Sequence, residues 1–226
     1  MSQQSAAGDN HTTGNTRFEF VFGGTFDPVH LGHQAILSAL RALSPSLPIR
    51  LIPCAIPPLK AQPHCQFEQR VAMLKLVTDN ITEVILDTQE KLRDKPSYTV
   101  ETLENLAQEY PCHGFILVMG MDSMASLRDW HEWQRLSQLC HLLIINRPGT
   151  NEMKVKHLSA AAGFNRVSSF KALTTSDQGN AFWLNMAEMS HSSTQIREAI
   201  NKGEPLDSLL SQSVIEYIGK NHLYKE

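Results

Sequence analysis

A strand, a helix and a second strand in close succession near the start of the chain constrain its fold most. Residues 18–22 form an apolar run that predicts a strand, residues 34–43 have apolar side chains at helical spacing, and residues 49–54 predict another strand. Three such elements within about 35 residues form a βαβ crossover, which joins parallel strands by a right-handed connection. The chain therefore begins as part of a parallel sheet.

The rest of the chain alternates in the same way. Further strands are predicted at residues 83–87, 113–119, 140–145 and 182–186. Further helices are predicted at residues 66–79, 192–201 and 213–221, and another begins at a cap, Ser97 or Thr99, and ends at residue 109. The pattern of residues 150–179 is weak and mixed, so a variable loop or an excursion from the regular fold is expected there. Together the elements predict an α/β fold, a Rossmann-like doubly wound parallel sheet of about five to six strands with helices on both faces.

Composition limits the kind of protein and its partners. A length of 226 residues fits one domain, expected at residues 18–226 after a polar, disordered tail at residues 1–17. With 20 basic and 23 acidic residues the net charge is -3, so no broad basic surface for nucleic acid is expected. The absence of an apolar signal region and of any run of membrane length predicts a cytoplasmic protein without a membrane partner. Four widely spaced cysteines fit free thiols in a reducing compartment.

The turn after the first strand, residues 23–33 (GGTFDPVHLGH), carries the strongest functional signal. Gly23 and Gly24 let the backbone turn tightly and approach a ligand. His30 and His33, three residues apart at a helix N-terminus, lie beside N–H groups without intrahelical partners and the positive end of the helix dipole. This combination suits phosphate. Two other interpretations are a simple glycine turn and a metal-binding histidine pair, although no third ligand stands at a useful spacing.

Other polar groups follow the later strands, where a parallel sheet binds ligands at its carboxyl edge. They are Lys60 at the end of a proline-rich loop, Asp122 after Gly120, and Arg197 beside the capping residues 192–194. Each also has a structural interpretation, since Asp122 could cap a helix and Arg197 could be an ordinary surface arginine. By spacing alone, Trp130 and Trp133 are more typical of a core than of a ligand-binding wall.

The residues also resemble a known family. Residues 23–33, with His30 and His33 in H-x-G-H, resemble the first signature of a nucleotidyltransferase superfamily, and residues 192–197 (SSTQIR) resemble its second. The wider pattern, over residues 18–224, is similar to the bacterial nicotinate mononucleotide adenylyltransferases. It includes the motifs PPLK at 57–60, Arg93 with PSYT at 96–99, GMD at 120–122, Trp130 with Trp133, and RPG at 147–149. The sequence departs from the family at Leu59, where histidine is usual, and at His191.

The resemblance implies a reaction in which ATP and nicotinate mononucleotide give nicotinate adenine dinucleotide and pyrophosphate. Its implied catalytic residues are His30, His33 and Arg197. The implied ATP-binding residues are Gly23, Gly24, Thr25, Phe26, His30, His33, Gly120, Asp122, Ser193, Thr194 and Arg197. The implied nicotinate mononucleotide-binding residues are Gly24, Thr25, Lys60, Thr99, Trp130 and Arg147, and Arg93 is a further candidate for phosphate.

The resemblance also sets expectations for cofactor and assembly. Mg²⁺ is expected to arrive with the ATP phosphates, without a metal site built from protein side chains. The protein is expected to be a monomer or a homodimer. Two alternatives remain open: a related transferase with another acceptor, such as phosphopantetheine or a CTP-using relative, and a catalytically silent nucleotide-binding regulator.

Overall fold

The centre of the fold is a sheet of seven parallel strands in the order β3-β2-β1-β4-β5-β7-β6. The computed structural model describes residues 17–146, 152–186 and 192–225. The strands are β1 (Arg17–Gly24), β2 (Ile49–Pro53), β3 (Val84–Leu86), β4 (His113–Gly120), β5 (His141–Asn146), β6 (Asn165–Arg166) and β7 (Asn180–Asn185). This confirms the predicted α/β, Rossmann-like class.

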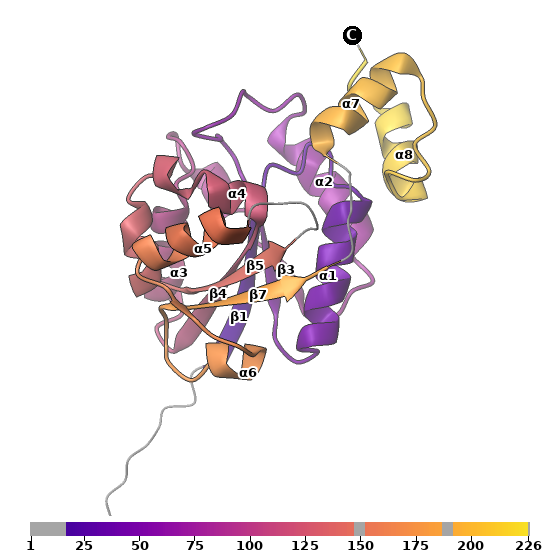
Figure 1. Cartoon of the computed structure of the whole chain (residues 1–226). Helices are drawn as coiled ribbons and strands as arrows, with labels where there is room; N and C mark the ends of the chain where they lie inside the picture. Colours follow the sequence, from indigo (N-terminus) through magenta and orange to yellow (C-terminus); the bar gives the residue numbers. More distant parts are fainter. Residues whose placement is uncertain (1–16, 147–151, 187–191, 226) are drawn as a thin grey trace, which may run out of the picture.

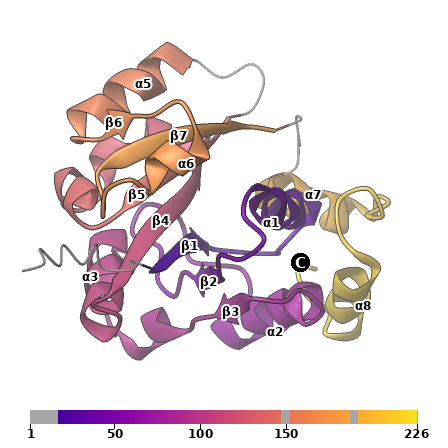
Figure 2. The ribbon, with the colours of Figure 1, turned by 90° about the horizontal axis from the view of Figure 1, so that it is seen from below.

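Helices cover both faces of the sheet, as Figures 1 and 2 show. One face is covered by α1 (Leu31–Leu43), α2 (Phe67–Thr78) and α6 (Phe170–Leu173). On the same side but farther from the sheet lie α7 (Ser193–Lys202) and α8 (Gln212–Lys220), and α8 packs against α2. The other face is covered by α3 (Thr99–Glu109), α4 (Met121–Ala125) and α5 (Glu152–Ala161), with the 3-10 helices η2 (Leu127–Asp129) and η3 (Trp133–Gln138). A further 3-10 helix, η1 (Gln89–Leu92), follows β3. None of the helices in the described ranges is both long and apolar enough to cross a membrane.

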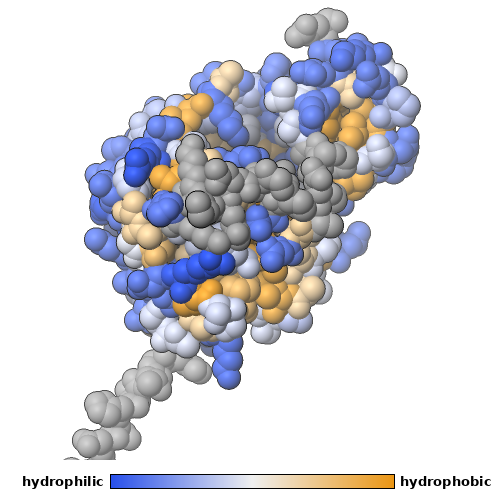
Figure 3. Space-filling view, in the orientation of Figure 1, coloured by the Kyte–Doolittle hydropathy of each residue, from blue (hydrophilic) through white to orange (hydrophobic). Residues whose placement is uncertain are grey.

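The core consists of two apolar clusters, one on each side of the sheet. Along β1, Phe20 and Phe22 belong to the cluster under α1 and α2, while Val21 belongs to the cluster under α3. This is the period-two alternation of a strand whose two faces are both covered. Figure 3 shows hydrophobic residues gathered beside β7, where Phe182 is only partly buried.

The prediction of a variable loop at residues 150–179 is wrong for its described part, since that part contains α5, β6 and α6. It also adds a seventh strand, one more than the predicted upper number. The reason is length: β6 has two residues and α6 has four, too few for either to show a period. Their positions come from tertiary contacts: the N–H of Asn165 in β6 donates to the carbonyl of Gly179 at 2.8 Å, and Nδ2 of Asn180 donates to the carbonyl of Leu173 in α6 at 3.2 Å.

Candidate functional site

The β1–α1 turn is built around the buried ring of Phe26. This ring is 2% exposed and packs edge-on against Phe22 and His33, with centroids 5.7 and 4.9 Å apart. A Cβ on Gly24 would lie 3.0 Å from the same ring, so a larger residue here would force the ring to shift. Because the Phe26 side chain faces the core, only its backbone is available to a ligand, whereas Thr25 is partly exposed.

The two histidines of the H-x-G-H motif form one unit at the start of α1. His30 is the N-cap residue and His33 is the third residue of the helix, and their rings stack with centroids 3.7 Å apart. The backbone N–H of His30 donates to Nδ1 of His33 at 3.2 Å. Because Nδ1 accepts a hydrogen bond, the proton of the neutral His33 ring is on Nε2, which can act as a donor. The helix begins three residues earlier than predicted, so both histidines belong to its first turn.

The second signature segment contacts the first directly. Arg197 Nη1 donates to the backbone carbonyl of Asp27 at 2.7 Å, and its Nη2 donates to Thr194 Oγ1 at 3.3 Å. Ser193 Oγ donates to the carbonyl of Pro28 at 3.1 Å. A capping box at Ser192 starts α7, as predicted. The N-terminal ends of α1 and α7, far apart in sequence, therefore meet at one loop.

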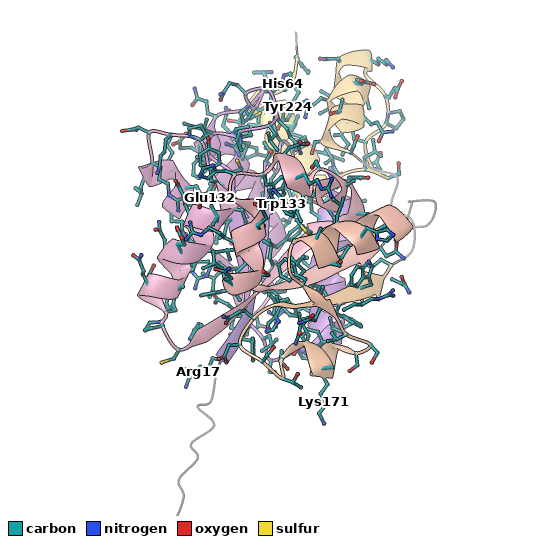
Figure 4. The ribbon with its side chains drawn as sticks, turned by 60° about the vertical axis from the view of Figure 1, so that its left-hand side comes forward. Arg17, His64, Glu132, Trp133, Lys171 and Tyr224 are labelled. Carbon is teal, nitrogen blue, oxygen red and sulfur yellow. The ribbon has the colours of Figure 1, made fainter. Side chains whose placement is uncertain are left out.

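Asp27, which sequence reasoning did not single out, holds this loop. Its side chain is 3% exposed and accepts hydrogen bonds from the hydroxyl of Tyr224 at 2.8 Å, from the N–H of His64 at 2.8 Å and from the N–H of Cys65 at 3.2 Å. Figure 4 shows His64 and Tyr224 together at the end of the molecule opposite Arg17, where β1 starts. They therefore lie at the carboxyl edge of the sheet.

A second positioning group lies beneath the turn. Arg70 of α2 is 1% exposed, and its Nη1 donates to the carbonyls of Thr25 at 2.6 Å and Cys54 at 2.7 Å. It thus joins the segment after β1 to the segment after β2. Burial lowers the pKa of its guanidinium from the ordinary value, and the charge of Asp27 opposes this shift. A charged residue on the apolar side of a helix is the sequence signal that could have identified it.

The segments that carry Thr99 and Trp130, two of the residues predicted to bind nicotinate mononucleotide, also lie next to each other. Thr99 is the first residue of α3, and Trp130 directly follows η2. Their neighbours Tyr98 and His131 have rings 4.3 Å apart, which places the two segments side by side. The N-cap of α3 is Tyr98, without a side-chain cap bond, so the prediction that Ser97 or Thr99 caps this helix is wrong.

Ser97 instead fixes the proline-rich loop. Its N–H donates to the carbonyl of Ile56 at 2.8 Å, and its Oγ accepts from the Ile56 N–H at 3.3 Å. Lys60, at the far end of that loop, is exposed. Arg93 is held by Thr102 Oγ1 at 3.0 Å and Gln89 Oε1 at 3.1 Å, so it braces the first turns of α3.

The other predicted nucleotide-binding residues lie at the end of β4 or outside the described part. Gly120 is the N-cap residue of α4, and Asp122 is exposed in its first turn. Arg147 and His191 lie outside the described residues. In the described ranges no group of three or more His, Cys, Asp or Glu side chains could hold a metal ion. The edge instead offers imidazole, guanidinium and hydroxyl groups beside two helix N-termini, which is a set of anion ligands.

A parallel sheet with an H-x-G-H turn and a second capped helix at its carboxyl edge defines a nucleotide-binding protein of the nucleotidyltransferase class. The model of the cytidylyltransferase-like family matches residues 21–199. Two relatives, from Pseudoalteromonas atlantica and Aeromonas salmonicida, are each named a probable nicotinate-nucleotide adenylyltransferase. They are 38% and 37% identical, over 91% of this chain in both cases and over 94% and 96% of their own lengths. The chain therefore belongs to the cytidylyltransferase-like family and, within it, to the nicotinate-nucleotide adenylyltransferases, which confirms the predicted family.

Solved structures agree with the fold. A Plasmodium falciparum nicotinic acid mononucleotide adenylyltransferase complexed with NaAD superposes with a TM-score of 0.74, covering 92% of this chain and 97% of that one. The same Plasmodium falciparum protein complexed with APC gives 0.71. The sequence identities are 18% and 17%, so these two structures support the shared architecture alone.

Proposed function

We propose that this chain transfers the adenylyl group of ATP to nicotinate mononucleotide, giving nicotinate adenine dinucleotide and pyrophosphate, at the carboxyl edge of its sheet. The observation that carries the site assignment is the direct contact between the two signature segments, through Arg197 and the carbonyl of Asp27 at 2.7 Å. This contact makes one anion site from the starts of α1 and α7. The names of the curated relatives support the same reaction.

The proposed reaction needs no general base. The attacking oxygen belongs to the phosphate of nicotinate mononucleotide and is already ionised at neutral pH. The protein must align this oxygen with the α-phosphorus of ATP and stabilise the charge that develops on the leaving pyrophosphate. Donors of hydrogen bonds suffice for both tasks.

On the ATP side, we assign the β- and γ-phosphates to Arg197, with the backbone N–H of Ser193, at the start of α7, and the hydroxyl of Thr194 as further donors. His33, through Nε2–H, and His30 are assigned to the phosphates nearer the reacting atom. Gly23, Gly24, Thr25 and Phe26 supply backbone at the junction of the two nucleotides, and Gly120 and Asp122 are assigned to the ribose of ATP.

Mg²⁺ fits this site as an ion bound to the substrate. The donors at the edge are cationic or neutral, and the described residues hold no cluster of metal ligands. Such a set suits an ion that binds through the ATP phosphates and keeps several waters. When bound, it would neutralise part of the charge on the leaving pyrophosphate.

On the acceptor side, we assign the nicotinate ring to Trp130 and its carboxylate to the start of α3 at Thr99. The first N–H groups of a helix have no intrahelical acceptor and lie at the positive end of its dipole. A carboxylate gains more from these donors than a neutral amide does, so this position favours the acid over nicotinamide mononucleotide. Lys60 and Arg147 are assigned to the acceptor phosphate.

Pyrophosphate release tests the proposal. The purified protein with ATP and Mg²⁺ is given nicotinate mononucleotide, nicotinamide mononucleotide or phosphopantetheine, and CTP replaces ATP in a parallel series. Turnover is expected with ATP and the acid mononucleotide, at a higher kcat/KM than with the amide. Turnover only with phosphopantetheine or CTP would assign a different acceptor or donor. ATP binding without any product would indicate a silent regulator and would refute the proposal.

A further inference from the structure

The short segment after α8 has an unusual backbone conformation. His222 and Tyr224 have positive φ angles of 51° and 60°, a conformation that non-glycine residues seldom adopt. Between them, Leu223 is 7% exposed in the core and its N–H donates to the carbonyl of Ile218 at 3.1 Å. Backbone strain of this kind persists only where surrounding contacts outweigh it.

One such contact joins this segment to the nucleotide-binding loop. The hydroxyl of Tyr224 donates to Oδ1 of Asp27 at 2.8 Å, across 197 positions in sequence. Burial raises the pKa of this hydroxyl, so it remains a donor throughout the physiological range. With the N–H groups of His64 and Cys65 on the same carboxylate, Asp27 is held from both the segment before α2 and the segment after α8.

Asp27 in turn contacts Arg197, the residue that we propose binds phosphate. Its carbonyl accepts from Arg197 Nη1, and its Oδ2 lies 3.9 Å from the same nitrogen. Any rotation of the Asp27 side chain or backbone therefore moves the acceptors that orient this guanidinium. Arg70, which is buried and bonds the carbonyl of the nearby Thr25, is a second cation at this turn.

We propose that Tyr224 is a positioning residue for adenylyl transfer: by holding Asp27 it orients Arg197 toward the phosphates of ATP. The proposal rests on the assignment of Arg197 to the β- and γ-phosphates. It gives the segment after α8 a role in the chemistry that acts through Asp27 and Arg197.

The test is Tyr224→Phe, which removes one hydroxyl and keeps the ring. Tyr217→Phe is the matched control, because Tyr217 lies on α8 and its hydroxyl has no hydrogen bond among the described residues. We expect kcat/KM for ATP to fall about tenfold in Tyr224→Phe, with the KM for nicotinate mononucleotide changed by less than about twofold and with the control unchanged. Circular dichroism and thermal unfolding establish that both variants are folded at the assay temperature.

A double-mutant cycle separates positioning from a general structural effect. If Tyr224 acts through Arg197, then adding Tyr224→Phe to Arg197→Ala causes no further loss of kcat/KM for ATP. Full additivity, or an equal loss toward both substrates, would overturn the proposal. If Arg197→Ala itself left kcat/KM for ATP unchanged, the assigned phosphate site would fail. If Arg197→Ala were damaging and Tyr224→Phe harmless, only the role of Tyr224 would fail.

Discussion

His33→Ala tests the proposed chemistry most directly. Nδ1 of His33 accepts from the His30 N–H, which leaves the Nε2–H of the neutral ring as the donor that we assign to the charge that develops during transfer. Loss of one such donor in comparable sites lowers kcat about 10²–10³-fold, which corresponds to about 2.7–4 kcal/mol. We expect a loss of this size in kcat with the KM for ATP changed by less than about threefold, because the interaction strengthens in the transition state.

The same substitution has a separate cost in stability. It removes the acceptor of the His30 N–H and the edge-on contact with Phe26 at 4.9 Å. A lost cap bond costs about 1 kcal/mol and a lost aromatic contact about 1 kcal/mol, so the free energy of unfolding should fall by about 2 kcal/mol. That leaves most of the protein folded at the assay temperature, and urea titration measures it independently of activity.

Steady-state kinetics with varied ATP provide the assay, and His64→Ala provides the control. The imidazole of His64 is exposed and only its backbone N–H bonds Asp27, so this substitution near the site should leave kcat unchanged. Equal effects of His33→Ala on kcat and on the affinity for ATP would refute a role specific to the transition state. A loss of activity that follows the unfolded fraction would instead assign His33 to the scaffold.

Three further predictions concern the scaffold and the turn. Gly24→Ala places a Cβ 3.0 Å from the Phe26 ring, so we expect lower kcat/KM and a loss of about 1–3 kcal/mol of stability, measured by kinetics and urea titration; unchanged kinetics would contradict this. Glu19→Ala removes the 2.9 Å partner of buried Arg50, which then keeps Asp87 at 3.0 Å, and should cost about 1.5–3 kcal/mol in urea unfolding, whereas a cost below about 1 would contradict it. Burial lowers the pKa of His141 below 6.5, so only the unfolded state gains this proton as pH falls through 6.5. The free energy of unfolding should then fall with decreasing pH by up to about 1.4 kcal/mol per unit, less steeply in His141→Gln; equal slopes would refute this.

The fold could be predicted wherever a segment was long enough to show its period. β4 and β5 are continuous apolar runs covered on both faces, and α1 has apolar residues at helical spacing, so each had a local signal. β6 had none, because two residues cannot establish a period, and its place beside β7 is set by bonds such as that from the Asn165 N–H to the carbonyl of Gly179. Short elements are fixed by partners that only the folded chain brings near.

The residues of the site also differ in whether the sequence carries a local signal for them. His30 and His33 are three positions apart, within one helical turn, and carried their signal locally, as did the helix that presents Arg197. Asp27 and Tyr224 carried no such signal, since their bond spans 197 positions and neither residue type is unusual in its own segment. Groups that contact phosphate must cluster at helix N-termini, where spacing reveals them, whereas groups that orient them can come from any element that reaches the edge of the sheet. The positioning residues of this site are therefore identified by their contacts in the fold and not by sequence motifs. Tyr224→Phe tests a role that was inferred from such contacts alone.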